Sequence, residues 1–277
     1  MVTSEQRRKQ LAREKFERQQ RRRATARQRA KTRNTVIAAL LVVLLGAGGT
    51  WAAVSAGGDG QEAGSEDTAA ESTPSAAPDP CEQPAEGEPG DQQWKEEPEL
   101  TVVGSASYTM TLETTCGDIG ITLDAENAPR TVSSFAFLAG EGYFDHTRCH
   151  RLVDQGIFVL QCGDPTGTGQ GGPGYTIPDE NLDDPAVADG TYPAGTVAMA
   201  NTYNAQADEG RDTGGSQFFL VYEDSPLPPD YTPFGEITEG MDVLNKIADA
   251  GSREDQEIAA TVPNATVVID RAEVAEG

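Results

Sequence analysis

The sequence lacks the cysteine and lysine patterns on which several common kinds of active site depend. Its 277 residues include only four cysteines, and no two of them form the Cys-x-x-Cys pair typical of zinc sites. The glycine-rich stretch 163–174 has no lysine and does not match the GxxxxGK(S/T) loop that cradles phosphates. Cys149 and His150 are neighbours and would point to opposite faces of a strand, which argues against a cysteine protease.

Basic residues are scarce after position 33. Residues 1–33 contain 13 Lys and Arg against three Glu, whereas the rest of the chain has eight Lys and Arg against 42 Asp and Glu. Such asymmetry indicates that the two parts have different surroundings. We interpret residues 1–34 as a basic, solvated cytoplasmic tail. Attraction to anionic lipid or nucleic acid is the alternative, and we expect no nucleic-acid partner.

One uncharged apolar run extends from residue 35 to residue 56. At roughly 1.5 Å per residue it can cross a hydrocarbon core of about 30 Å, with the basic flank on the cytoplasmic side. A cleaved signal peptide ending near Ala56 is the alternative, but the charged leader is longer than such peptides usually have. No cysteine follows the run closely, which argues against a lipoprotein. We therefore expect a single-pass transmembrane helix that anchors the chain in the lipid bilayer, with the remainder outside the cytoplasm.

Residues 57–98 have the composition of a linker. They contain six Pro, six Gly and twelve Asp or Glu against the single Lys95. Such a segment buries too little apolar surface to offset its conformational entropy, so we expect it to be disordered. Cys81 and Trp94 are its two exceptional residues.

From residue 99 the composition is that of a globular domain, which we expect to extend to residue 277. Many short alternating runs and only two helical patterns predict a mostly β fold. The loop 201–215 is long and polar, as functional loops often are. The expected strands are 108–114, 119–123, the arms of a hairpin within 149–164, 196–200, 216–222, 233–237 and 265–269, and the expected helices are 128–138 and 241–250.

The hairpin contains the most unusual charge of the chain. Alternation places Arg151 and Val153 on one face of its first arm and Val159 and Gln161 on one face of its second, with a turn at 154–156. An arginine among apolar residues, with no acidic residue close by in sequence, requires either a partner or a function.

The four cysteines would lie on the outer side of the membrane, where disulfides form. Cys149 and Cys162 flank the hairpin symmetrically, and strand pairing could place them opposite each other. We therefore predict a Cys149–Cys162 bond and, by elimination, a Cys81–Cys116 bond that ties the linker to the domain. Buried free thiols are the alternative.

Several short motifs, in order and with rough spacing, resemble the cyclophilin-type peptidyl-prolyl isomerases from about Ser107 to about Ala250. The resemblance implies a closed eight-stranded antiparallel barrel capped by two helices, preceded here by the transmembrane helix and linker. It also implies an isomerase of Xaa-Pro bonds that needs no metal or cofactor. The motifs are His150-Arg151, Phe158, Gln161-Cys162-Gly163-Asp164, Met199-Ala200-Asn201, Gly215-Ser216-Gln217-Phe218-Phe219 and Phe234-Gly235.

The resemblance also implies roles for individual residues. Arg151 matches the catalytic arginine, and a guanidinium suits this role because it stays protonated and presents several N–H groups. His150 matches an active-site neighbour, with a structural hydrogen-bonding role as the alternative. The implied substrate-binding residues are Phe158, Val159 and Phe219 around the proline ring, Gln161, Asn201 and Gln217 on the substrate backbone, and Ala200, Leu227 and Tyr231 along the groove.

The chain departs from the family pattern at three positions. Val159 replaces a common methionine, Pro226 a frequent tryptophan and Tyr231 a second histidine. A tyrosine ring could still close the pocket. Two functions follow: a monomeric, membrane-anchored isomerase that assists the folding of exported proteins, or a non-catalytic chaperone or scaffold that holds proline-containing segments.

Overall fold

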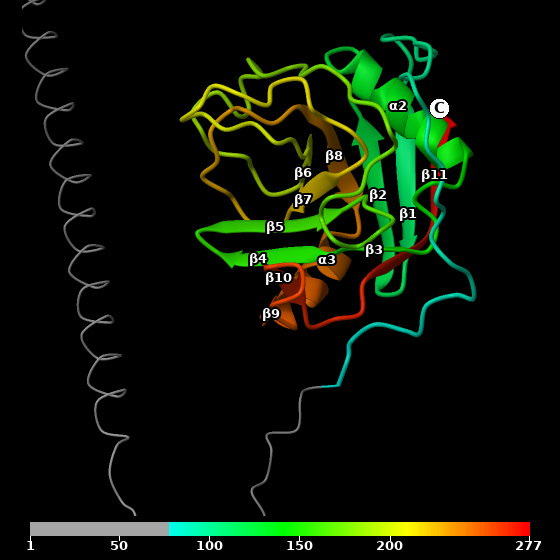
Figure 1. The fold of residues 1–277 in the computed structure, drawn as a ribbon, viewed down its shortest axis with the longest axis vertical. Helices are drawn as coiled ribbons and strands as arrows, with labels where there is room; N and C mark the ends of the chain where they lie inside the picture. The colour runs from blue at the N-terminus through cyan, green and yellow to red at the C-terminus, as the bar shows by residue number, and fades with distance from the viewer. Residues whose placement is uncertain (1–77) are drawn as a thin grey trace, which may run out of the picture. The chain divides into compact units, whose positions relative to one another are not determined.

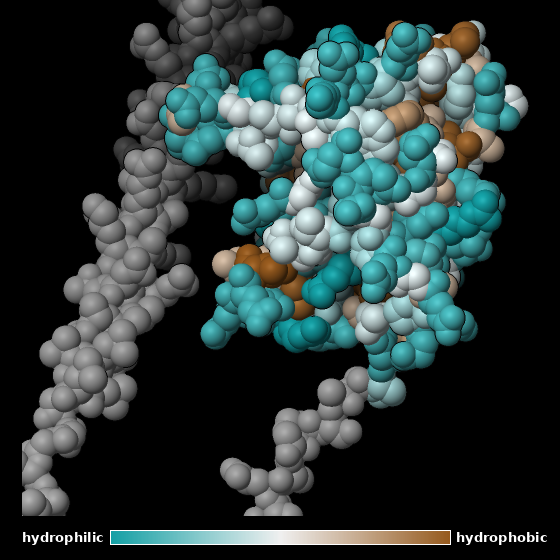
Figure 2. Space-filling model, turned by 45° about the vertical axis from the view of Figure 1, so that its right-hand side comes forward, coloured by the Kyte–Doolittle hydropathy of each residue, from teal (hydrophilic) through white to brown (hydrophobic). Residues whose placement is uncertain are grey.

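The computed structural model describes residues 78–277. The predicted basic tail, the predicted membrane span and the first part of the predicted linker lie outside the described residues. Within residues 78–277, no helix is both long enough and apolar enough to span a bilayer. The surface visible in Figure 2 is dominated by hydrophilic side chains, consistent with the acidic excess of this part of the sequence.

A nine-stranded antiparallel sheet forms the body of the domain (Figure 1), and a separate hairpin pairs β9 with β10. Neighbouring strands follow the order β3-β11-β1-β2-β8-β6-β7-β5-β4. The strands are β1 Tyr108–Thr114, β2 Gly117–Leu123, β3 Thr147–Arg148, β4 Arg151–Gln155, β5 Ile157–Cys162, β6 Thr196–Met199, β7 Phe218–Val221, β8 Pro233–Glu239, β9 Ser252–Asp255, β10 Ala260–Pro263 and β11 Val268–Glu276.

The expectation of a closed eight-stranded barrel is wrong for the described residues. The sheet has nine strands, and its two edge strands, β3 and β4, are not paired with each other. β3 has only two residues, and both pair with β11, so the ladder ends before β4 begins. The β9–β10 hairpin lies against the edge of β4 instead, where the Thr261 hydroxyl donates to the Leu152 carbonyl at 2.6 Å.

Both helices occur close to the predicted positions: α2 spans Pro129–Gly140 and α3 spans Met241–Asp249. Pro129 suits the first turn of α2, where a backbone N–H would have no helical partner. The buried face of α2 fills the inside of the sheet with aromatic contacts. The Phe135 ring lies 4.5–5.5 Å, between centroids, from those of Phe144, Phe218 and Phe234.

Two groups of strands differ from the sequence predictions. β9 and β10 were not predicted, because the charged run Ser252–Asp255 has no apolar alternation and pairs only with its own hairpin partner. The C-terminal strand is β11 rather than 265–269. It continues to Glu276 because β11 pairs along the whole length of β1, with Ile269 and Ala272 buried.

The hairpin of β4 and β5, which contains Arg151, has a tighter turn than expected. Arg151 pairs with Gln161 and Gln155 pairs with Ile157, so Gly156 alone turns the chain. Its φ of 83° is a conformation that glycine adopts without the steric cost of a Cβ. The strand register is therefore one residue from that assumed in predicting the disulfide.

The structure contains both predicted disulfides, Cys149–Cys162 and Cys81–Cys116. Cys149 precedes β4 instead of pairing within it, and its N–H donates to the Val267 carbonyl at 2.9 Å. The link between the two arms of the hairpin therefore depends on the loop before β4, not on a cross-strand pair.

Residues 78–98, which we call the strap, lie against the domain, although their composition predicts disorder. The strap is held by the Cys81–Cys116 bond and by Trp94, whose ring centroid lies 5.1 Å from that of Phe137 and 5.8 Å from that of Tyr143. The Trp94 N–H also donates to the Pro173 carbonyl at 2.8 Å. Average composition misses these contacts because they depend on individual residues of the strap.

We expect Trp94→Ala to lower the free energy of unfolding by about 2 kcal/mol, because the change removes a half-buried ring with two aromatic neighbours. Denaturant unfolding of the full-length variant measures the change. Gln92→Ala, an exposed neighbouring position, is the matched control and should leave stability within about 0.5 kcal/mol. Equal stability of the two variants would show that the Trp94 ring contributes nothing to the stability of the fold.

Candidate active site

Strands β5, β6 and β7 bury side chains on both faces. In β7, Phe218 and Leu220 belong to the main core, whereas Phe219 and Val221 belong to a second apolar cluster on the opposite face. This explains why β7 is apolar without interruption. The buried members of the second cluster are Val159, Val187, Tyr192, Ala198, Phe219 and Val221, and its partly buried members are Val153, Ile157, Ala200, Leu227 and Tyr231.

Three long polar side chains form a hydrogen-bonded row on the same face. Arg151 Nη1 donates to Gln161 Oε1 at 3.2 Å, Gln161 Nε2 donates to Gln217 Oε1 at 2.9 Å, and Gln217 Nε2 donates to the Gly171 carbonyl at 2.8 Å. The guanidinium faces an amide oxygen, so each amide donates away from the cation. No salt bridge with Arg151 occurs in the described part of the chain, so its charge remains available to a ligand beside the apolar cluster.

Most of the predicted site residues are brought together on this face. Arg151, Gln161 and Gln217 form the polar row, and their strands also carry the apolar members of the site. The predicted residues in the second cluster are Val159, Ala200, Phe219, Leu227 and Tyr231.

Phe158 does not join them. It alternates with Val159 along β5, and its ring packs edge-on against Tyr222, with 5.9 Å between centroids. Neighbouring residues on a strand project to opposite faces. The expectation that Phe158 and Val159 line the same pocket is therefore not met.

Tyr192 and Val187 are site residues that the sequence did not indicate. The buried Tyr192 hydroxyl donates to the Tyr231 carbonyl at 2.6 Å and accepts from the Tyr231 N–H at 3.1 Å. These bonds hold the Tyr231 ring edge-on to Phe219, with 5.4 Å between centroids. Both missed residues come from the loop before β6, and no local pattern links that loop to the cluster.

Asp230 and Arg151 both influence the ionisation of the Tyr231 phenol. Burial and the neighbouring Asp230 raise the pKa of the Tyr231 phenol, whereas Arg151 lowers it. The phenol therefore stays neutral near pH 7.

The Asn201 side chain forms its hydrogen bonds with the loops around it. Its Nδ2 donates to the Asp230 carbonyl at 2.8 Å, and its Oδ1 accepts the Tyr203 N–H at 3.2 Å. An amide used in this way fixes the loops beside the groove. Any contact of Asn201 with a ligand therefore falls to its backbone.

Asp164 organises the glycine-rich loop that ends the polar row. Its buried carboxylate accepts five backbone N–H groups of residues 166–171, at 2.7–3.1 Å. Burial raises the pKa of Asp164, but the hydrogen bonds, led by those from Gly171 and Thr166, outweigh this and lower it. A Cβ on Gly171 would lie 2.0 Å from Asp164 Oδ1, so this close approach requires glycine.

A groove of about 790 Å³ continues from the polar row along this loop. It is lined by Gln161, Gln217, Ala200, Asn201 and residues 169–176, and Gln93 of the strap contributes to its wall. Within residues 78–277, no group of three or more His, Cys, Asp or Glu side chains could hold a metal ion. The site therefore combines one cation and an apolar cluster with amide groups that line the adjoining groove.

Residues 109–274 match the sequence model of the family described as cyclophilin type peptidyl-prolyl cis-trans isomerase/CLD. The chain belongs to the cyclophilin-type peptidyl-prolyl isomerase family. The match covers more than half of the chain and all of the strands that carry the site. It supports the resemblance that the short motifs indicated.

Named relatives agree with this membership. The chain is 46% identical over 155 residues to a probable peptidyl-prolyl cis-trans isomerase B of Mycobacterium leprae, covering 53% of this chain and 50% of that protein. It is 42% identical over 125 residues to peptidyl-prolyl cis-trans isomerase B of Bacillus subtilis, covering 45% of this chain and 78% of that protein. The chain spans about half the length of its mycobacterial relatives.

A solved cyclophilin-type isomerase of Cryptosporidium parvum has a similar fold, with a TM-score of 0.51 and 27% identity over 62% of this chain and 99% of that one. A second crystal structure of that protein, in the presence of the dipeptide Ala-Pro, matches with a TM-score of 0.50.

His150 lies beneath the glycine-rich loop of this cyclophilin domain. It is 2% exposed, and neither ring nitrogen has a hydrogen-bond partner among the described residues. Burial lowers the pKa of the imidazole, Asp164 raises it, and Arg148 and Arg151 lower it again. His150 is therefore neutral near pH 7 and packs behind the site.

We expect the domain to lose stability as the pH falls below about 6.5. The pKa of His150 is lowered in the folded state, so the unfolded chain takes up a proton first, between that pH and the lower folded value. Denaturant unfolding at pH 7.5, 6.5 and 5.5 measures this loss. His150→Asn should have a flatter profile over the same range, and an unchanged slope would assign the loss to other groups.

Proposed function

We propose that this protein is a peptidyl-prolyl cis–trans isomerase that acts on Xaa-Pro bonds of exported proteins and assists their folding at the outer face of the membrane. The observation that carries the catalytic part is the position of Arg151. Its guanidinium stands beside an apolar pocket, held by Gln161 and without an acidic partner in the described residues. The printed names of the bacterial relatives support the same activity.

The chemistry requires a donor and a clamp. Rotation about a peptide bond breaks amide resonance, with a barrier of about 18–20 kcal/mol. In the twisted transition state the prolyl nitrogen regains a lone pair that can accept a hydrogen bond. A group that donates to this nitrogen only in the twisted state lowers the barrier. Arg151 would make this donation while Val159, Phe219, Leu227 and Tyr231 hold the proline ring.

The groove would bind the part of the substrate outside the proline ring. Gln161 and Gln217 have amide groups on its wall, and Ala200 and Asn201 offer backbone atoms beside it. An extended peptide laid along this wall would keep its proline at the second cluster and its preceding residues along the glycine-rich loop. The Ala-Pro dipeptide used with the Cryptosporidium protein is consistent with a proline-containing ligand.

Exchange measurements test the activity. Full-length protein should accelerate cis–trans exchange of a short Ala-Pro peptide, followed by NMR exchange spectroscopy, above the uncatalysed rate of once in tens to hundreds of seconds. Peptide binding without accelerated exchange would instead identify a non-catalytic module that holds proline-containing segments. Absence of both would reject each function.

The location is a separate part of the proposal and rests on the sequence. The uncharged run 35–56 is long enough to span a bilayer, and its basic flank favours a cytoplasmic N-terminus. Two disulfides suit an oxidising compartment. Protease added to intact cells stripped of their wall should cleave the domain and spare a tag at residue 1. The reverse pattern would place the domain in the cytoplasm.

A further inference from the structure

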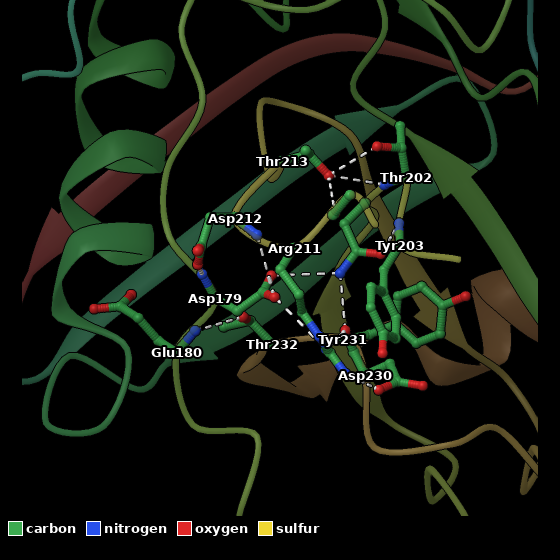
Figure 3. A network of polar contacts seen from close by, with 12 residues as sticks. Asp179, Glu180, Thr202, Tyr203, Arg211, Asp212, Thr213, Asp230, Tyr231 and Thr232 are labelled. Carbon is green, nitrogen blue, oxygen red and sulfur yellow. Dashed lines mark hydrogen bonds and ion pairs between the residues drawn. The ribbon is translucent and has the colours of Figure 1, made fainter. Parts of the chain in front are cut away.

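Arg211 joins three loops that surround the second cluster (Figure 3). It lies in the loop between β6 and β7, where its guanidinium carbon stacks 3.4 Å from the centroid of the Tyr203 ring. Its Nη2 forms an ion pair with Asp230, in the loop before β8, and its Nη1 lies 3.6 Å from Asp179, in the segment before β6. One side chain thus connects segments that are distant in the sequence.

The same loops are fastened to each other by bonds around Arg211. The Asp179 N–H donates to the Asp212 carboxylate at 2.9 Å, and the Asp212 N–H donates back to Asp179 at 3.3 Å. The hydroxyl of Thr213 accepts the Thr202 N–H at 3.0 Å and closes the base of the loop. Arg211 therefore belongs to a network of ion pairs and hydrogen bonds that fixes the position of its side chain.

This network bears directly on the wall of the pocket. Asp230 precedes Tyr231, whose ring contacts Phe219 in the second cluster. The Asp230 carbonyl accepts from both Asn201 Nδ2, at 2.8 Å, and Arg211 Nη1, at 3.4 Å. Movement of Asp230 would therefore shift Tyr231 and release Asn201 together.

Charge makes Arg211 hard to replace. The side chains of Asp179 and Asp230 are only 8% and 17% exposed, and both face the same guanidinium. Without it, two partly buried carboxylates would repel each other beside Asn201. Basic residues are scarce in this domain, and no other ion pair with Asp179 or Asp230 occurs among the described residues.

We propose that Arg211 is a positioning residue for the proline pocket: it holds the Asp230–Tyr231 segment against the second cluster. This rests on the proposed isomerase function. Arg211 does not face the reacting bond, so its loss should lower the affinity for proline and leave the hydrogen-bond donor, Arg151, in place. The substrate affected is any Xaa-Pro peptide, because the wall contacts the proline ring itself.

Three variants of the full-length protein test this proposal: Arg211→Gln, Arg211→Lys and Asp230→Asn. Arg211→Gln should lower kcat/KM for an Ala-Pro peptide about 10-fold, mainly through KM, because a displaced wall binds proline less well. Arg211→Lys keeps the charge but not the stacked planar group, so its kcat/KM should lie between those of the wild type and Arg211→Gln. In the Asp230→Asn background, Arg211→Gln should cost less than threefold, since the ion pair between Arg211 and the Asp230 carboxylate is already lost there.

Arg253→Gln is the matched control. It removes the same charge from the β9–β10 hairpin, where Arg253 bonds to the Pro263 carbonyl, and should leave kcat and KM unchanged. A loss in Arg211→Gln carried by kcat, a loss of equal size in the Asp230→Asn background, or a loss matched by Arg253→Gln would each overturn the proposal.

One readout is independent of catalysis. The Tyr231 amide and ring NMR signals of the ligand-free protein should shift in Arg211→Gln and stay unchanged in Arg253→Gln. A wild-type protein without isomerase activity would reject the proposed function, while this shift would still report whether Arg211 holds the wall. Unmoved Tyr231 signals in an active enzyme would reject the positioning role alone.

Discussion

Arg151→Ala should lower kcat/KM for isomerisation of an Ala-Pro peptide by about 100-fold, the usual cost of removing one donor aimed at a transition state. Arg151 is half-buried and has one hydrogen-bond partner among the described side chains, the Gln161 amide. Its removal leaves the second cluster intact, so peptide affinity should change little. The loss should therefore fall on kcat, as expected for an interaction made only in the twisted state.

Two companion variants make the result specific. Arg151→Lys keeps the charge but cannot hold Gln161 and the substrate at once with a planar group, so we expect a loss of about 10-fold. Arg148→Ala removes an exposed arginine on β3, close in sequence, and should retain full activity. Exchange rates and peptide affinities from the same NMR titration provide both kinetic and binding terms. A fully active Arg151→Ala protein would mean that the pocket alone catalyses rotation.

The sequence predicted the polar row of the site better than its walls. Arg151 and Gln161 were both predicted as site residues, and in the observed register they pair directly across the hairpin, which places their side chains on the same face. The walls depend on loops: Tyr192 and Val187 reach the second cluster from a segment with no periodic pattern. Phe158 was misplaced because family resemblance was applied to adjacent residues whose side chains, by strand geometry, point to opposite faces.

The fold shows the same division between local pattern and distant contact. Elements with clear periodicity, such as β1, β2 and α2, lie within two residues of their predicted positions. Closure of the sheet could not be read from such patterns, because it depends on whether two edge strands, β3 and β4, meet. The strap was also predicted incorrectly from residue 78 onward. Its anchors, Cys81 and Trp94, are single residues in a segment whose average composition is polar.

Asp164→Ala should destabilise the domain by about 3 kcal/mol, because it removes the buried carboxylate that accepts five backbone N–H groups of the glycine-rich loop. Denaturant unfolding of the full-length protein measures this change. Asp145→Ala is the matched control, since its carboxylate accepts a single backbone N–H, from Ala272, and should cost about 1 kcal/mol. Equal losses in the two variants would show that the glycine-rich loop holds its shape without Asp164.

Substitution of Asp164 should also affect the active site, through the polar row. Gly171 donates its N–H to Asp164 and accepts from Gln217 Nε2 through its carbonyl, so a relaxed loop no longer fixes the amide that holds Gln161 and, through it, Arg151. Asp164→Asn, which keeps the shape but accepts through one oxygen, should therefore lower kcat by about threefold to tenfold at a temperature where it remains folded.

The dependence of stability on acid pH provides an independent check on Asp164. The pKa of Asp164 is lowered on folding, so its contribution is complete above about pH 4 and is lost as the pH falls further. In Asp164→Asn that acid-dependent loss should be smaller than in the wild type, because the group that titrates is gone.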